Sequence, residues 1–183
     1  MLKLSLANNE QFERINQLDA AYFPENESID CKRLMELKRQ GILKFYALTD
    51  TEQFGNTTLG GASIISHNHL NLWYVFVIDE ALRTHGIGQQ AITLINSLYE
   101  EEGLFGEIES PDYMEKSHLD LRNYYLRNGF QSTGIRVSMG SNSLEVLARN
   151  CNITPEIYLD FYYSLFGKQY IEEEFQLKIL SIN

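Results

Sequence analysis

The sequence predicts an α+β protein in which a mixed, mostly antiparallel sheet is flanked by helices. Three β-branched and aromatic runs follow one another with only turn-rich segments between them, which indicates an antiparallel meander. Stretches with apolar residues at helical spacing precede and follow this meander. The 183 residues suit a single domain, with a core over about residues 1–149 and a C-terminal helical extension over about 150–183.

The chain begins with a strand and two helices. We expect the strand over Leu2–Leu6 and the first helix over Asn9–Tyr22, where apolar residues recur at helical spacing. A second helix is expected over Ile29–Gln40, ended by Gly41. The strands of the meander are predicted at Lys44–Thr49, Leu59–Ser66 and Leu70–Ile78.

Helices and strands alternate in the second half of the chain. In order, we expect a helix over about Gln89–Glu101, a strand at Leu104–Glu109, a helix at Leu119–Asn128, and strands near Ser132–Met139 and Leu144–Arg149. The segment Thr154–Phe166, with Pro155 in its first turn, should form an amphipathic helix. We expect that helix to cover the core or an open sheet edge, with a homodimer interface as the alternative. The run Glu172–Glu174 is expected to be a solvated surface.

Composition narrows the function. The chain is 44% apolar and 22% charged, as is typical of folded globular proteins. Its net charge of −10 disfavours nucleic acids and anionic membranes and would attract a cationic substrate, although acidic charge also serves solubility alone. Since no run approaches the roughly 20 apolar residues of a membrane span, and no signal peptide is evident, we expect a cytoplasmic protein. Cys31 and Cys151 are expected to be reduced and structural, and no metal is expected.

The clearest functional signal follows the third strand of the meander. There the strand LNLWYVFVI leads into DEALRTHGIG and then into a helix. Without a Cβ at Gly86 and Gly88, the backbone can turn its N–H groups inward, and the helix start adds its positive pole. This pattern predicts an anion cradle suited to a pyrophosphate, although two glycines between a strand and a helix also make an ordinary loop.

This segment resembles the coenzyme A loop of the GNAT superfamily of N-acetyltransferases, Gln/Arg-x-x-Gly-x-Gly/Ala, with Arg83, Gly86 and Gly88 in the motif positions. The resemblance implies that the backbone near Val77 and Ile78 binds the pantetheine arm and the thioester carbonyl of acetyl-CoA. It further implies that these loop residues hold the cofactor: Arg83, Thr84, His85, Gly86, Ile87, Gly88 and Gln89.

A second match lies in RNYYLRNGF, which resembles the Tyr-x-x-x-Gly-Phe segment of the same family and places Tyr125, Gly129 and Phe130 in its positions. A plain helix terminus explains the glycine and phenylalanine equally well. The resemblance implies that Tyr125 donates a proton to the departing coenzyme A thiolate, with packing against the cofactor as the alternative. Glu80 and Thr84 depart from the family pattern in the loop, but neither removes a phosphate-binding N–H. His118 and Leu121 depart from it on the later helix, so the resemblance does not define cofactor contacts on that helix.

The implied reaction is direct attack of a primary amine on the acetyl thioester, which requires a base. Glu107 and Glu109 lie two apart on the strand GEIES; Glu109 is the preferred base, and Glu107 is equally explained as an exposed strand residue. Turn formation explains His67 and His69 adequately. The family builds its acceptor site from segments matched here by Phe23–Ile42 and Phe54–Gly61. Three acidic residues in the first segment suit a cationic small-molecule amine, which is the preferred acceptor, although a protein amino terminus would fit their charge equally well: Glu25, Glu27 and Asp30.

Two other functions compete with this interpretation. GIGQQA also fits the dinucleotide pattern Gly-x-Gly-x-x-Ala of NAD-dependent oxidoreductases, but the polar DEALRTH separates the strand from the glycine. A non-catalytic acyl-CoA sensor with the GNAT fold is the second alternative. An enzyme needs Tyr125 and a nearby carboxylate, whereas a pure binder does not.

Overall fold

The chain divides into two compact units. The computed structural model describes residues 1–20, 29–55, 57–110 and 116–182, apart from the side chains of residues 83, 84 and 116–118. The first unit comprises Met1–Ser66 and Trp73–Glu100, and the second comprises His67–Leu72 and Glu101–Asn183.

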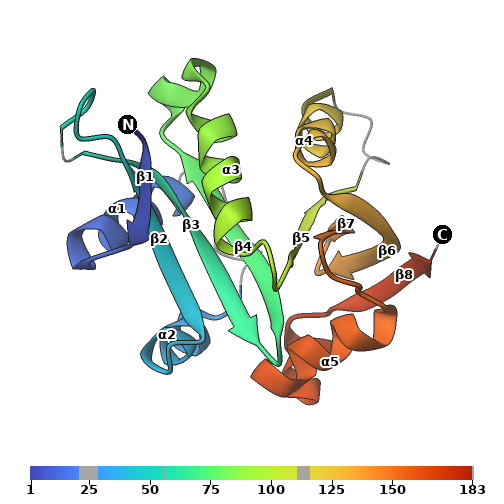
Figure 1. Ribbon diagram of the computed structural model, residues 1–183. Helices are drawn as coiled ribbons and strands as arrows, with labels where there is room; N and C mark the ends of the chain where they lie inside the picture. The colour runs from blue at the N-terminus through green and yellow to red at the C-terminus, as the bar shows by residue number, and fades with distance from the viewer. Residues whose placement is uncertain (21–28, 56, 111–115, 183) are drawn as a thin grey trace. The chain divides into compact units, whose positions relative to one another are not determined.

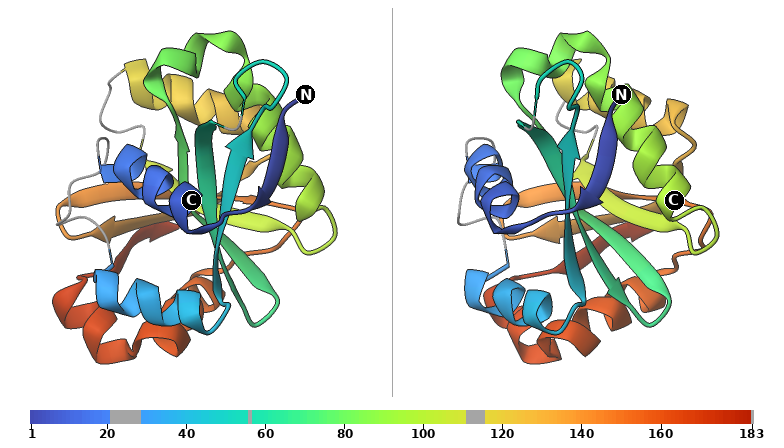
Figure 2. Two further views of the ribbon diagram at one scale, coloured as in Figure 1. Left: turned by 90° about the vertical axis from the view of Figure 1, so that its left-hand side faces the viewer. Right: turned by 60° about the vertical axis from the view of Figure 1, so that its left-hand side comes forward.

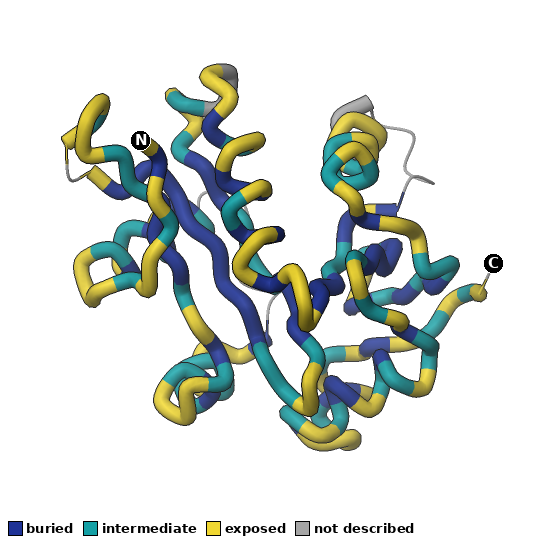
Figure 3. The backbone as a smooth tube through the Cα atoms, in the orientation of Figure 1, coloured by how far each residue is buried: buried dark blue, intermediate teal, exposed yellow. Residues whose placement is uncertain are grey.

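The first unit is built on four neighbouring strands (Figure 1). In sheet order they are β1 (Lys3–Leu6), β2 (Leu43–Thr49), β3 (Thr58–His67) and β4 (Leu70–Ile78). β2 is antiparallel to both β1 and β3. β3 is buried over nearly its whole length (Figure 3). The predicted meander is therefore confirmed, with β4 at its predicted bounds.

Helices cover both faces of these strands (Figure 2). They are α1 (Asn9–Ala20), α2 (Cys31–Arg39) and α3 (Ile87–Leu98). One buried cluster joins α1 to the strands: Ile15, Leu18, Ala47 and Val77. A second buried cluster joins α3 to the strands. In it, Leu48 and Ile78, which directly follow Ala47 and Val77, pack with Ile87 and Ala91 of α3. Because successive strand residues point to opposite faces, α1 and α3 lie on opposite sides of the sheet.

Helix ends in this unit differ from the predicted ones for identifiable reasons. α2 begins at Cys31 and not at Ile29, because Asp30 caps it by accepting a hydrogen bond from the Lys32 N–H (2.9 Å). α3 begins two residues before Gln89, directly after a left-handed Gly86, and it ends at Leu98. A 3₁₀ helix, Glu80–His85, occupies what was expected to be loop. The expected end of the first helix at Tyr22 lies outside the described residues.

The second unit contains four antiparallel strands in the order β5-β7-β6-β8. Its elements are β5 (Leu104–Glu109), α4 (Lys116–Arg127), β6 (Gln131–Met139), β7 (Asn142–Arg149), α5 (Pro155–Phe166), a π-helical turn (Tyr170–Glu174) and β8 (Lys178–Ile182). The π-helical turn and β8 were not predicted. The expected exposure of Glu172–Glu174 is confirmed. With both units mostly antiparallel and flanked by helices, the α+β fold class is confirmed.

α5 covers the core of this unit. Its N-cap Thr154 accepts a hydrogen bond from the Ile157 N–H (3.3 Å), and Pro155 stands in its first turn. Four aromatic residues on it are buried: Tyr158, Phe161, Tyr162 and Phe166. Phe161 meets Phe105 of β5 edge to face, with ring centroids 5.1 Å apart. The predicted covering role is therefore confirmed for the core.

Candidate cofactor-binding site

Asp79 fixes the chain where β4 ends. Its backbone N–H donates to the Leu59 carbonyl oxygen (2.9 Å), which keeps the residue beside β3. Its Oδ1 accepts from the Ala81 N–H (3.2 Å) and caps the 3₁₀ helix, while its Oδ2 accepts from Arg14 of α1 (2.6 Å). Asp79 thus joins the strand, α1 and the 3₁₀ helix. Sequence analysis did not single out this residue, although an aspartate just before a helix is a recognisable N-cap signal.

Gly86 turns the chain from the 3₁₀ helix into α3. Its φ of 72° lies in the left-handed region that favours glycine, and a Cβ there would meet no described atom within 4 Å. Gln90 donates its N–H to the Gly86 carbonyl oxygen (3.2 Å), which closes the first turn of α3. The first turn of an α-helix also forms its positive pole. The strand, the left-handed glycine and the helix start are therefore arranged as an anion cradle requires.

Val77 and Ile78 have buried side chains, with exposed fractions of 4% and 7%. Val77 packs in the cluster of α1, and Ile78 packs in the cluster of α3. A Cβ on Gly60 would collide with the carbonyl oxygen of Val77, so β3 approaches β4 closely here. These two residues can therefore offer a ligand only their backbone, which is the role that the resemblance gives them.

The other loop residues differ in what they can contribute. His85 and Gln89 are exposed, Gly88 is half-buried and Ile87 is buried. The Ile87 side chain belongs to the core, so it anchors α3 and leaves the backbone for a ligand. Arg83 and Thr84 have their backbone in the 3₁₀ helix, and their side chains lie outside the described part of the chain.

Tyr125, the predicted acid, lies on α4 in the second unit. Its ring meets Tyr124 and Phe130 edge to face, with centroids 5.6 and 5.4 Å away. Its carbonyl oxygen accepts the N–H groups of Asn128 (3.0 Å) and Phe130 (3.2 Å) as the helix ends before Gly129. Burial raises the pKa of Tyr125 well above its ordinary value, and neighbouring Tyr124 raises it further. The phenol therefore stays protonated at neutral pH, as a proton donor must.

A bidentate ion pair holds α4 on β7. Arg122 Nε donates to Glu145 Oε2 (2.7 Å), and an Arg122 terminal nitrogen donates to Oε1 (3.0 Å). The Glu145 side chain is 5% exposed and that of Arg122 is 28% exposed. Burial acts to raise the pKa of Glu145, but hydrogen bonds from Arg122 and Ser132 outweigh it, so the pKa is lowered. This pair sets the position of the helix that carries Tyr125.

The two strand glutamates have different surroundings. Glu107 Oε1 accepts hydrogen bonds from the hydroxyls of Tyr158 and Tyr162, both at 2.6 Å. Burial raises the pKa of Glu107 even though these two bonds favour its charged form. The alternative that Glu107 is an exposed strand residue is therefore wrong, because α5 covers it. Glu109, the preferred base, is exposed at the end of β5.

The remaining reactive residues have structural explanations. Asn68 and His69 have φ of 50° and 62°, which is the pattern of a two-residue type I′ hairpin turn, and the His67 ring packs edge-on against Phe161. Cys31 and Cys151 are both free.

In the described residues, no group of three or more His, Cys, Asp or Glu side chains is placed to hold a metal ion. Among the helices of that same part, none is long and apolar enough to cross a membrane.

No protein-family model matches the sequence, and no curated protein matches it. A solved structure from Bacteroides thetaiotaomicron, assigned to the GNAT family of acetyltransferases, does match, with a TM-score of 0.68. The match covers 96% of this chain and 99% of that chain at 16% sequence identity. The chain has the GNAT fold.

Two other solved structures with known reactions share the GNAT fold with this chain. A chimeric spermidine N-acetyltransferase from Vibrio cholerae matches with a TM-score of 0.58, over 81% of this chain and 94% of its own, at 14% identity. A ribosomal-protein alanine N-acetyltransferase from Escherichia coli matches with a TM-score of 0.55, over 85% and 97%, at 13% identity. At identities this low, the likeness establishes the fold alone.

Proposed function

We propose that the chain is an N-acetyltransferase that transfers the acetyl group of acetyl-CoA to a primary amine. The arrangement at the end of β4 carries this proposal: a strand end where Val77 and Ile78 offer only their backbone, a left-handed Gly86 and the positive pole of α3 follow one another. Such an arrangement suits the pyrophosphate of coenzyme A. Its occurrence in a chain with the GNAT fold makes acetyl-CoA the expected ligand.

Direct attack accounts for the reaction without a covalent enzyme intermediate. The neutral amine nitrogen attacks the thioester carbonyl carbon, the C–N bond forms and the C–S bond breaks. We assign Glu109 to accept the amine proton, directly or through water, and Tyr125 to protonate the leaving thiolate. The phenol of Tyr125 carries a proton at neutral pH, as a donor to the thiolate must, and its raised pKa makes it a weaker acid than an exposed tyrosine. Backbone N–H groups near Val77 and Ile78 are assigned to the carbonyl oxygen.

The proposed acceptor is a cationic small molecule. Proteins with this fold act on small amines such as spermidine and also on protein amino groups such as that of a ribosomal-protein alanine. The net charge of −10 supports a cation in either form, because an acidic surface raises the local concentration of positive ligands.

The structure argues against a dinucleotide oxidoreductase. In that fold the first glycine follows a parallel strand almost at once. Here Asp79 and the 3₁₀ helix Glu80–His85 stand between β4 and Gly86, and the strands before the motif are antiparallel.

Calorimetric titration of the whole chain with acetyl-CoA, with NAD as the control, tests the proposal. We expect acetyl-CoA alone to bind, and a panel of amines to release free thiol from it. Binding without thiol release from any amine would favour the acyl-CoA sensor. No binding by the folded chain would contradict the cradle itself.

Gly86→Val, compared with Gly41→Val, locates the cofactor. The two glycines have φ of 72° and 73°, and neither has a described atom within 4 Å of its would-be Cβ. Both variants should therefore lose a similar stability, about 1–2 kcal/mol for a left-handed β-branched residue. Only Gly86→Val should weaken acetyl-CoA binding, by about tenfold or more, because its side chain blocks close approach of the ligand to the backbone. Equal affinities in the two variants would contradict this location.

A further inference from the structure

A polar groove of about 960 Å³ lies between α1, the end of β2 and the start of β3. The described residues that line it belong to the first unit, and all of them have polar side chains. Four of them follow the spacing of a single helix face on α1: Glu10, Glu13, Arg14 and Gln17. Sites for small molecules usually have volumes of roughly 300–1,000 Å³. The groove therefore has the size of a small-molecule site, and its lining disfavours an apolar ligand.

The groove and the cofactor cradle lie on opposite sides of the strands of the first unit. Thr49 at the end of β2 lines the groove, and it follows Ala47, which packs in the cluster of α1, by two residues. Because alternate strand residues share a face, Thr49 lies on the side of α1. The cradle is built at the start of α3, on the other side. A ligand of the groove would therefore be a molecule other than the one in the cradle.

Thr58, the first residue of β3, contributes a buried hydroxyl to the wall of the groove. It is 8% exposed and stands opposite Thr49 in the register of β2 and β3. Its hydroxyl makes no hydrogen bond within the described part of the chain. A buried hydroxyl without a partner reduces stability, and proteins retain such groups mainly where a ligand, an ion or water completes them. Thr58 therefore offers its hydroxyl to a ligand in the groove.

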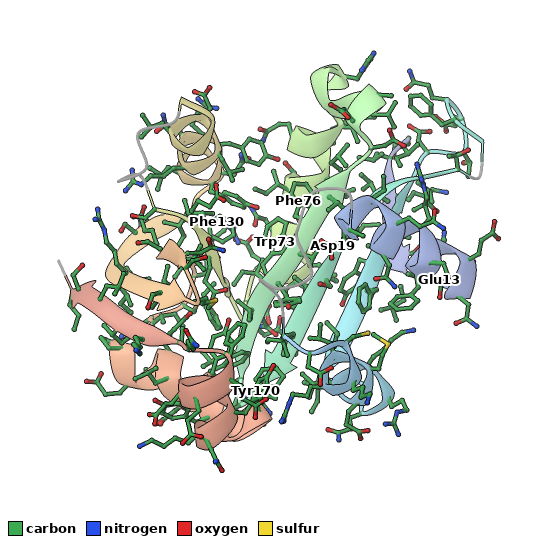
Figure 4. All side chains as sticks on the ribbon, turned by 180° about the vertical axis from the view of Figure 1, so that it is seen from behind. Glu13, Asp19, Trp73, Phe76, Phe130 and Tyr170 are labelled. Carbon is green, nitrogen blue, oxygen red and sulfur yellow. The ribbon has the colours of Figure 1, made fainter. Side chains whose placement is uncertain are left out.

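The free charge of the groove is negative. Arg14 is the one cation among the described residues that line it, and a terminal nitrogen of its guanidinium donates to Asp79 Oδ2 (2.6 Å). Glu10 and Glu13 make no ion pair with any residue that the structure describes. Figure 4 shows Glu13 on the outer side of α1, where its carboxylate is open to a ligand from solvent. These charges favour a positively charged ligand.

We propose that the groove is a second binding site, for a small organic amine that carries ammonium groups. The Glu10 and Glu13 carboxylates accept hydrogen bonds from the charged N–H groups, and such charge-assisted bonds are the stronger kind. An ammonium has three N–H donors, so the neutral oxygens of Thr58 and Gln17 can accept the remaining ones. This inference goes beyond the proposed function, since the site neither contains nor requires acetyl-CoA.

Calorimetric titration of the whole chain with 1,4-diaminobutane in the absence of acetyl-CoA tests the site, with uncharged 1,4-butanediol as the ligand control. We expect the wild-type chain to bind the diamine and not the diol. The double variant Glu10→Gln/Glu13→Gln should bind the diamine about tenfold more weakly or worse, because two charged acceptors are lost. Glu101→Gln/Glu102→Gln removes the same charge from two exposed positions that do not line the groove and should change the affinity less than about twofold.

Thr58→Val separates binding of a ligand from a structural role of the hydroxyl. Valine keeps the shape of the side chain and should weaken diamine binding by about threefold or more, because one hydrogen-bond acceptor is lost. The urea midpoint should stay the same or rise, since an unpartnered buried hydroxyl is removed. Thr51→Val, at an exposed position after β2, is the control and should leave the affinity within about twofold. A lower urea midpoint for Thr58→Val with unchanged diamine affinity would contradict the role given to Thr58.

The outcomes separate this site from the proposed function. No diamine binding by the wild-type chain, equal binding of the diol, or equal losses in the two double variants would overturn the inference. Urea unfolding of each variant serves as the test of folding. Diamine binding that depends on Glu10 and Glu13 in a chain that does not bind acetyl-CoA would leave this site standing and remove the acetyltransferase proposal. Acetyl-CoA binding by a chain that does not bind the diamine would have the reverse meaning.

Discussion

Replacing Arg122 with methionine should destabilise the chain mainly through the carboxylate left behind on β7. Glu145 is 5% exposed at its side chain and accepts both hydrogen bonds of a bidentate pair from Arg122. Removing one partner of a buried ion pair costs about 3–5 kcal/mol, and the partial exposure of Arg122 favours the lower end, about 3 kcal/mol. For a chain of this length, that corresponds to a fall in Tm of about 6–12 °C.

The pH dependence has a definite sign. The folded-state pKa of Glu145 is lowered, so the pair contributes stability above the unfolded pKa of a glutamate, and this contribution is lost as pH falls through the folded pKa. The gap in unfolding free energy between wild type and Arg122→Met should therefore be largest near pH 7. It should narrow as pH falls toward about 4, because without Arg122 burial raises the pKa of Glu145 and the carboxyl of the variant becomes protonated.

Urea unfolding of four chains checks this reasoning: wild type, Arg122→Met, Glu145→Leu and the double variant. Because the double variant leaves no buried charge, it should be more stable than Arg122→Met, with a coupling energy of about 2 kcal/mol or more. Arg127→Met, an exposed position on the same helix, is the control and should cost less than about 1 kcal/mol. Additive single effects, or an equal loss from Arg127→Met, would refute the importance of the buried pair.

Two further substitutions test the neighbouring chemistry. Tyr125→Phe should lower kcat by about 100-fold or more while leaving the Kd for acetyl-CoA unchanged, since only a proton donor is removed. Tyr124→Phe is the matched control. Equal turnover in the two variants would show that Tyr125 is not the acid. Tyr158→Phe should cost about 1.5–3 kcal/mol in urea unfolding, because it removes a 2.6 Å hydrogen bond to Glu107. Tyr163→Phe removes a hydroxyl that bonds the exposed Glu172 and should cost clearly less, and similar losses would contradict the greater strength of the Tyr158–Glu107 bond.

The elements that sequence reasoning predicted best were those defined by local pattern. Leu70–Ile78 and Leu104–Glu109 are apolar runs bounded by polar or turn-forming residues, and both strands have the predicted bounds. β8 was missed because its five residues alternate between exposed and half-buried, and its pairing with β6 comes from a distant part of the chain. The 3₁₀ helix was missed because its sequence EALRTH carries no periodic apolar pattern, and Asp79 starts it by a single capping bond.

The sequence predicted Gly86, the glycine that turns the chain, but not the surroundings of two carboxylates elsewhere in the chain, Glu107 and Asp19. Gly86 was recognisable because a left-handed position between a strand and a helix has a chemical signature. Glu107 was not recognisable as buried, since the two tyrosines that bond it lie 51 and 55 residues further along the chain. Asp19 belongs to a helix whose apolar spacing was predicted, yet its burial depends on the strand packed beneath that helix.

The bond between Glu107 and α5 makes one strand position dependent on the C-terminal extension. Without Tyr158 and Tyr162, the carboxylate of Glu107 would sit beside Phe105 with an uncovered, apolar surface around it. A protein of this fold that ends before such a helix has no use for an acidic residue there and should carry an apolar or solvent-adapted one. Proteins of this fold that carry a glutamate at this strand position should therefore also carry tyrosines on such a helix. In sequences without a determined structure, the glutamate and the tyrosines together would then indicate that the helix is present.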